Sequence, residues 1–132
     1  MAKAKKDLRA LALAPGAGFR SKTVTVPEWG DVAVILREPS AGAWALWQEI
    51  ISPTEDEDAQ PLSVAEKTRR NVRGDVVLFI DVLWDEDGEQ VFSADDDDTV
   101  AGIYGPVHAR LLHQALDLMT SQADAEKKSK SP

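Results

Sequence analysis

The chain contains no cysteine and no long apolar run. Without cysteine, disulfide bonds, thiol nucleophiles and thiolate metal sites are excluded, which fits a reducing compartment. No apolar stretch approaches the roughly 18–20 residues that cross a bilayer, so we expect no membrane-spanning segment. The N-terminus carries lysines, but the apolar stretch at 8–14 is short and contains Arg9. We therefore predict no signal peptide.

Basic residues are also in short supply, with 15 Lys and Arg against 23 Asp and Glu, giving a net charge of −8. Residues 85–98 contain eight acids and no Lys or Arg, so this block equals the whole net charge. Nucleic-acid binding needs a basic surface that neutralises phosphates, and the sequence pI near 4.7 argues against it. The acidic balance does permit binding to a basic protein.

The length of 132 residues and a hydrophobic content of 43% are typical of one globular domain. We predict a flexible basic N-terminus at 1–18, compatible with a short helix at 8–13, and a single α+β domain at 19–120. The polar, lysine-rich residues 121–132 are predicted to form a disordered tail. The predicted fold is α+β, with an N-terminal β-hairpin packed with about three to four helices and disordered termini.

Residues 23–37 have the alternation of a β-hairpin. Val24 and Val26 alternate with threonines, and the alternation resumes at residues 32–36. Pro27 and Gly30 stand between the two halves and predict the loop there. Trp29 lies in this turn, where it is the hardest of the four tryptophans to bury, so it is our best candidate for a contact surface.

A helix is predicted over 41–51. Ser40 is suited to cap its start, and Trp44, Trp47 and Ile51 recur at the spacing of one helical face. Each of these tryptophans can also serve simply as core, because an indole buries much area.

The C-terminal half contains two further predicted helices. A capping-box-like start at residue 93 opens a short helix that ends near residue 102. The clearest helix in the chain is 107–119, where a wide apolar stripe includes Leu112 and Leu116.

The stretch between these helices is ambiguous. Ser63 and Glu66 form a capping box, and helical spacing of the following apolar residues favours one helix over about 64–84. Residues 76–84 are nevertheless β-branched and aromatic, and a turn at 85–88 can return the chain as a hairpin. We favour the helix and leave the hairpin open as the alternative.

The sequence contains no recognisable catalytic, cofactor or metal-binding motif. If Gly88 is placed sixth in a calcium loop, positions one and twelve become Leu83 and Ala94, which lack ligand oxygens. His108 and His113 are five apart, which is not the spacing of a metal pair on one helical face. No phosphate loop or nucleophile elbow is present. We predict no enzyme, cofactor or metal site.

Two motifs in a fixed order carry a resemblance to a known family. The first is Thr-Val-Thr-Val-Pro-Glu-Trp-Gly-Asp at 23–31, and the second is Asp-Glu-Asp-Gly-Glu-Gln-Val-Phe-Ser-Ala-Asp-Asp at 85–96. A helix lies between them, and a small helix and a final helix follow. Over about residues 20–120 this arrangement resembles the tail assembly chaperones of long-tailed bacteriophages and prophages.

The resemblance implies a non-catalytic factor of the host cell cytoplasm that is not expected in the mature virion. Such chaperones bind and solubilise the tape measure protein and promote polymerisation of the tail tube. The resemblance also implies a weak homo-oligomer, and a longer form, made by a ribosomal frameshift, that contacts the tail tube protein. Lys127 and Lys128 permit an A-rich slippery run in the gene.

We hypothesise that the turn tryptophan and the apolar faces of two helices contact the client or other copies. The residues concerned are Trp29, Trp44, Trp47, Leu112 and Leu116. The main alternative is an acidic interaction module outside tail assembly, such as a DNA-mimicking inhibitor. Its charges should spread along one long face, whereas here they gather in 85–98. An enzyme would require a metal site at 95–98.

Overall fold

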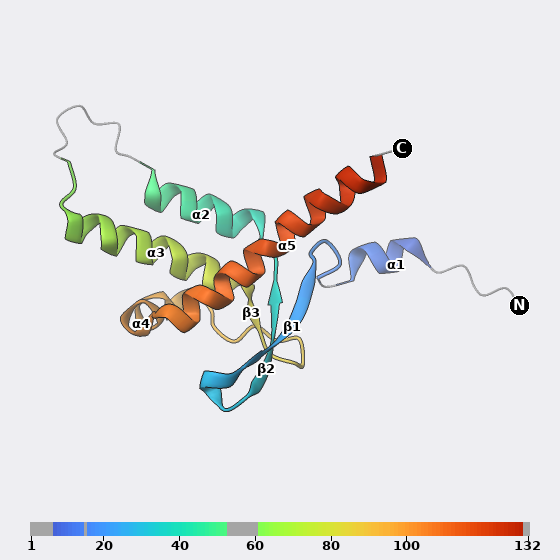
Figure 1. Cartoon of the computed structure of the whole chain (residues 1–132), viewed down its shortest axis with the longest axis horizontal. Helices are drawn as coiled ribbons and strands as arrows, with labels where there is room; N and C mark the ends of the chain where they lie inside the picture. The colour runs from blue at the N-terminus through green and yellow to red at the C-terminus, as the bar shows by residue number, and fades with distance from the viewer. Residues whose placement is uncertain (1–6, 15, 53–60, 131–132) are drawn as a thin grey trace, which may run out of the picture.

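A three-stranded antiparallel sheet in the order β1–β2–β3, with helices against one face, forms the fold of this computed structural model (Figure 1). It describes residues 7–14, 16–52 and 61–130, with side chains as far as residue 119. In chain order the elements are α1 Leu8–Leu13, β1 Ser21–Val26, η1 Pro27–Trp29, β2 Val32–Arg37, α2 Ala41–Ile51, α3 Val64–Val82, β3 Leu83–Trp84, η2 Ala94–Asp96, α4 Asp97–Ile103 and α5 Pro106–Lys130. The predicted α+β class is confirmed.

The predicted β-hairpin is present as β1 and β2. Its register pairs Val26 with Val32 beside the turn and Ser21 with Arg37 at the open end. Gly30 and Asp31 both have positive φ, at 75° and 61°, which glycine and short polar residues tolerate best. The chain can therefore reverse within the few residues after Pro27.

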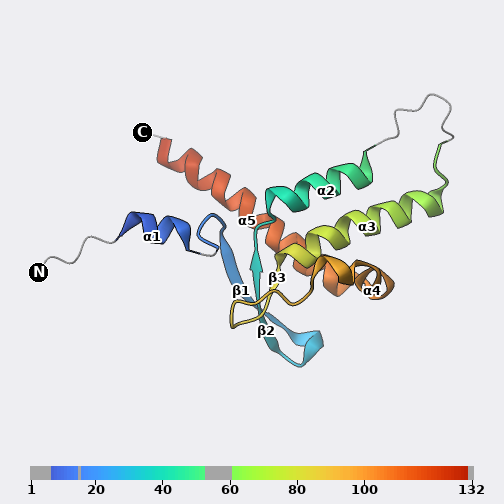
Figure 2. The same cartoon turned by 180° about the vertical axis from the view of Figure 1, so that it is seen from behind.

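The core lies between the inner face of the sheet, the C-terminal half of α3 and the start of α5. Phe79 on α3 is fully buried at its centre, and Leu36 from β2 and Leu111 from α5 are fully buried as well. Burial of one such side chain contributes about 1.5–3 kcal/mol. Figure 2 shows from behind how α5 crosses the hairpin and α3.

The ambiguous stretch contains both a helix and a strand. Helix α3 runs from residue 64 to residue 82, so the helix prediction was wrong only for Leu83 and Trp84. These two residues pair with Leu36 and Ile35 of β2, because joining the ladder satisfies their backbone groups. The turn that follows returns the chain, and Trp84 bridges to Gln90. The hairpin alternative was therefore correct for Leu83 and Trp84 and wrong for residues 76–82, which are helical.

The two C-terminal helices, α4 and α5, begin close to the positions that the sequence predicts. Ser93 and Asp96 form a reciprocal capping box ahead of α4. Helix α5 begins at Pro106 and continues past residue 119, where the sequence predicts its end, to Lys130. The added residues are rich in Ala, Glu, Gln and Lys, whose helix propensity is high. The predicted division at 1–18, 19–120 and 121–132 stays a prediction, and residues 1–6, 15, 131 and 132 lie outside the described residues.

Helices α2 and α3 pack side by side as an antiparallel pair, visible from both sides (Figures 1 and 2). Gly74 on α3 is buried beneath α2. A Cβ at this position would lie 3.0 Å from Trp47 Cδ1 and 3.1 Å from Ile51 Cγ2. The close approach of the two helices therefore depends on the absence of a side chain at residue 74.

This packing predicts opposite effects of the same substitution at two helical glycines. Gly74→Ala should lower the free energy of unfolding by about 1–2 kcal/mol, because the clash outweighs the gain in helix propensity. Gly102→Ala in α4 meets no atom within 4 Å and should raise stability by about 0.5–1 kcal/mol. Urea unfolding followed by circular dichroism measures both. Equal effects at the two sites would contradict the packing account.

Candidate partner-binding surface

The hairpin tip, residues 27–32, displays apolar side chains to solvent. Trp29 is 37% exposed and Val32 is 44% exposed. The 3₁₀ turn that presents Trp29 starts at Pro27, whose ring fixes φ, and closes when Gly30 N–H donates to the Pro27 carbonyl at 3.2 Å. A rigid turn thus holds a large aromatic side chain partly open to solvent.

The hairpin tip is fastened to α5 by an ion pair and an aromatic contact. Arg110 donates two hydrogen bonds to the Glu28 carboxylate, from Nη2 to Oε1 at 2.6 Å and from Nη1 to Oε2 at 2.7 Å. The hydrogen bonds from Arg110 hold the pKa of Glu28 at about 2, and the same bonds raise the pKa of Arg110. The Trp29 ring lies 5.6 Å from the His108 ring at a tilt of 55°.

A cluster of aromatic rings supports the hairpin tip from below. His108 lies edge-on to Phe79 at 5.2 Å and stacks on Tyr104 at 5.5 Å. Its Nδ1 accepts a hydrogen bond from the Gly105 N–H at 3.0 Å. Burial lowers the pKa of His108, so a neutral ring occupies this position at neutral pH. Trp29 is therefore connected to the hydrophobic core through His108 and Phe79.

Trp29 was predicted from the sequence as a contact residue, but the residues that hold it in place were not. Glu28 and Arg110 are 82 positions apart, and no local pattern connects them. Nothing in the sequence placed His108 in an aromatic cluster, because its spacing to His113 bears only on metal binding. Its aromatic surroundings come from helices whose relative placement a single sequence does not encode locally.

The other predicted contact residues divide between the surface and the core. Trp44 and Trp47 come together as an edge-to-face pair with centroids 5.4 Å apart, and both are half-buried. Leu116 is half-buried against the core. Leu112 is only 2% exposed and belongs to the core, so its position gives no support to a direct role in partner binding. Leu46 of α2, which was not among the predicted contact residues, is 51% exposed.

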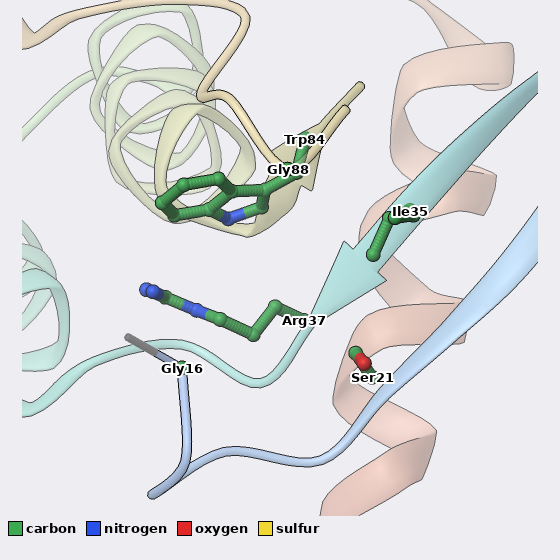
Figure 3. Close-up of a pocket in the computed structure, with 6 residues that line it drawn as sticks. All are labelled: Gly16, Ser21, Ile35, Arg37, Trp84 and Gly88. Atoms are coloured by element: carbon green, nitrogen blue, oxygen red, sulfur yellow. The ribbon is translucent and has the colours of Figure 1, made fainter. Parts of the chain in front are cut away.

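The outer face of the sheet has a pocket of about 230 Å³ (Figure 3). The Arg37 guanidinium lies there 4.1 Å from the Phe19 ring centroid and 4.8 Å from that of Trp84. It donates to Asp81 Oδ2 at 3.1 Å, and the same carboxylate accepts from Ser40 N–H at 2.6 Å and from Ser40 Oγ at 3.2 Å. The Arg37 guanidinium is thus held by three side chains, those of Phe19, Asp81 on α3 and Trp84 on β3.

The acidic stretch 85–98 also serves local structure. Asp85 Oδ1 accepts hydrogen bonds from the N–H groups of Asp87 and Glu89, both at 2.9 Å, which closes the turn. Asp96 completes the capping box before α4. Within the described residues, no group of three or more His, Cys, Asp or Glu side chains is arranged to hold a metal ion.

No helix in the described part of the chain combines the length and apolar character needed to cross a membrane.

The Glu28–Arg110 pair predicts a pH dependence of stability. The pKa of Glu28 falls from an ordinary 4.5 to about 2 on folding, so the pair stabilises the fold above about pH 4.5 and is lost as the pH falls towards 2. The difference in unfolding free energy between the protein and Glu28→Gln should be constant above about pH 5 and shrink below it. Urea unfolding across pH measures the difference. In the Arg110→Ala variant, the pKa of Glu28 measured by NMR should return towards 4.5. An unchanged pKa would show that Arg110 is not the cause of the lowered value.

The hydrogen bonds to Asp81 predict a large effect of removing one charge. Asp81→Asn should lower the free energy of unfolding by about 2 kcal/mol, because three donors lose a charged acceptor. The matched control is Asp75→Asn on the same helix, where burial already raises the pKa of the carboxyl. That change should alter stability by less than about 0.5 kcal/mol or raise it. A greater loss at residue 75, measured by urea unfolding, would contradict this account.

Comparison with known proteins agrees with the resemblance seen in the sequence. A family model described as phage tail assembly chaperone matches residues 7–128. The solved structure of the bacteriophage HK97 tail assembly chaperone is similar, with 55% sequence identity and a TM-score of 0.76 over 87% of this chain and 99% of that chain. No curated protein sequence matches the chain. On the family match and this likeness, the chain belongs to the phage tail assembly chaperone family.

Proposed function

We propose that this protein binds the tape measure protein, keeps it soluble and promotes polymerisation of the tail tube, without catalysis. The family membership of the chain is the observation that carries this proposal. The work would take place in the host cell cytoplasm, before the mature virion forms. We include in the proposal a weak homo-oligomer and a longer, frameshifted form that contacts the tail tube protein.

The surface described above has the chemistry that such a client requires. A long helical client exposes apolar stripes, and an aromatic side chain on a rigid support covers them with little loss of conformational entropy. Trp29 meets this description, because the ion pair at Glu28 and the ring of His108 hold the turn on α5. The net charge of −8 helps keep a complex soluble while its apolar surfaces are covered.

A small apolar contact suits a chaperone that must later release its client. The hairpin tip exposes only the side chains of Trp29 and Val32 as large apolar groups. One such contact gives weak binding, whereas several copies along a long client add up through avidity. We propose that Trp29 and the exposed part of α2 make these repeated contacts, and that the half-buried pair of Trp44 and Trp47 contributes to the α2 surface.

Co-expression with the tail tape measure protein tests the client contact. Trp29→Ala should reduce the soluble yield of that client by at least about threefold, because aromatic anchors carry a large share of binding energy. Val91→Ala is the control, since it also shortens an exposed apolar side chain, outside the proposed surface. Thermal unfolding of each variant verifies that the fold persists. A client yield with Trp29→Ala equal to that of the unaltered protein would exclude the proposed role of Trp29.

A further inference from the structure

The first half of α3 carries a group of basic side chains in an otherwise acidic protein. Residues 66–73 contain four basic side chains and one acid, whereas the whole chain has a net charge of −8. Arg73 follows Arg69 by four residues and Arg70 by three, so these like charges are neighbours on the helix and repel one another. Helix stability therefore does not account for the group, and a negatively charged partner would offset the repulsion.

The three arginines line a groove where α2 ends and α3 begins, at the end of the helix pair that lies away from the sheet (Figure 1). We name it the arginine groove, and its volume is about 440 Å³. Its lining consists of Ile50, Leu62, Glu66, Arg69, Arg70 and Arg73. Leu62 is 38% exposed and Ile50 is half-buried. The arginine groove thus presents cationic and apolar groups beside one another.

The charges of the arginine groove are not neutralised within the described residues. The two ion pairs of that part of the chain lie at the sheet and at the hairpin tip, and neither includes a groove arginine. Arg70 is half-buried, and its covered Nε has no hydrogen-bond acceptor there. Because a buried N–H without an acceptor is unfavourable, a ligand oxygen that drew this guanidinium into the groove would stabilise it.

The acids near the arginine groove are engaged elsewhere or lie to one side of it. The Glu66 carboxylate accepts a hydrogen bond from the Ser63 N–H at 3.0 Å, as part of the capping box that begins α3. Asp97 and Asp98 border Arg73 at a separate, smaller cavity. Arg69 and Arg70 are therefore the cationic groups that a ligand in the groove would meet.

An acidic segment of a partner protein is the occupant that this chemistry favours. A guanidinium can bind a carboxylate through two parallel hydrogen bonds, and an amphipathic helix brings acidic and apolar side chains together at one groove. Nucleic acid fits less well, because the acidic remainder of the chain would repel its extended row of phosphates. We propose that the arginine groove binds an acidic amphipathic helix of a partner protein, with carboxylates on Arg69 and Arg70 and an apolar side chain against Leu62.

This contact goes beyond the proposed function, because it adds a second binding surface with a different chemistry. The hairpin tip offers the aromatic ring of Trp29, whereas the arginine groove offers positive charge beside apolar walls. The two surfaces share no residue, so the failure of one proposal can be distinguished from the failure of the other.

A synthetic acidic peptide tests the arginine groove in the full chain. The probe is a fluorescent helix of about 15 residues with glutamates and leucines on one face, and fluorescence anisotropy measures its binding. The Kd should lie below about 300 µM at about 50 mM salt, and about 500 mM salt should weaken binding at least about fivefold, because salt screens exposed charges. Arg69→Gln with Arg70→Gln should weaken it at least about tenfold.

Matched variants separate the arginine groove from a general effect of charge or apolar surface. Arg9→Gln with Lys67→Gln removes the same charge outside the groove lining and should change the Kd by less than about twofold. Leu62→Gln should weaken binding at least about threefold, whereas Val64→Gln, at an exposed position where α3 begins, should not. Trp29→Ala should bind the peptide as the unaltered protein does. Thermal unfolding verifies the fold of each variant.

Four results would overturn the proposal. The first is no binding of the acidic peptide, or equal binding of a version with glutamine in place of glutamate. The second is an equal loss in the variant altered at Arg9 and Lys67. The third is equally tight binding of a single-stranded DNA of about 15 nucleotides, which would indicate general attraction of anions. The fourth is binding that appears only after the four acids at 55–58 are neutralised, since the chain's own acids would then be the occupant.

Discussion

The carboxylate of Asp81 joins three elements that are distant in the chain, and the arrangement of the other parts depends on this junction. It holds Arg37 at the end of β2 and the backbone and hydroxyl of Ser40 at the start of α2, while itself standing near the end of α3. Charged hydrogen bonds in a partly buried site are stronger and more directional than apolar contacts. Apolar burial drives these elements together, and the hydrogen bonds to Asp81 tie the end of β2 and the start of α2 to α3.

Pattern-based prediction succeeded where a local rule governs the structure. The alternation around Pro27 and Gly30 defined the hairpin, and the capping boxes at Ser63 and Ser93 marked two helix starts that the structure confirms. The end of α3 was missed because pairing of Leu83 with β2 is a tertiary effect that competes with helical spacing. Local periodicity also does not reveal which side of a helix another element will cover.

The same distinction applies to the candidate surface. Trp29 was predicted from its place in a turn, which is a local property, and its exposure agrees with that reasoning. Leu112 was chosen from an apolar stripe, and a stripe on an amphipathic helix usually marks the side that packs inward. The Glu28–Arg110 pair joins residues 82 positions apart, and finding it required the three-dimensional placement of the hairpin on α5.

The passage from α3 into β3 occurs without any intervening loop. Val82 ends the helix, and Leu83 already pairs with β2, so the backbone has no freely rotating residue at this junction. Helix α3 and the sheet are therefore joined rigidly, with no loop between them. A load applied to the far end of the α2–α3 pair, where α3 begins, would turn the whole sheet with it.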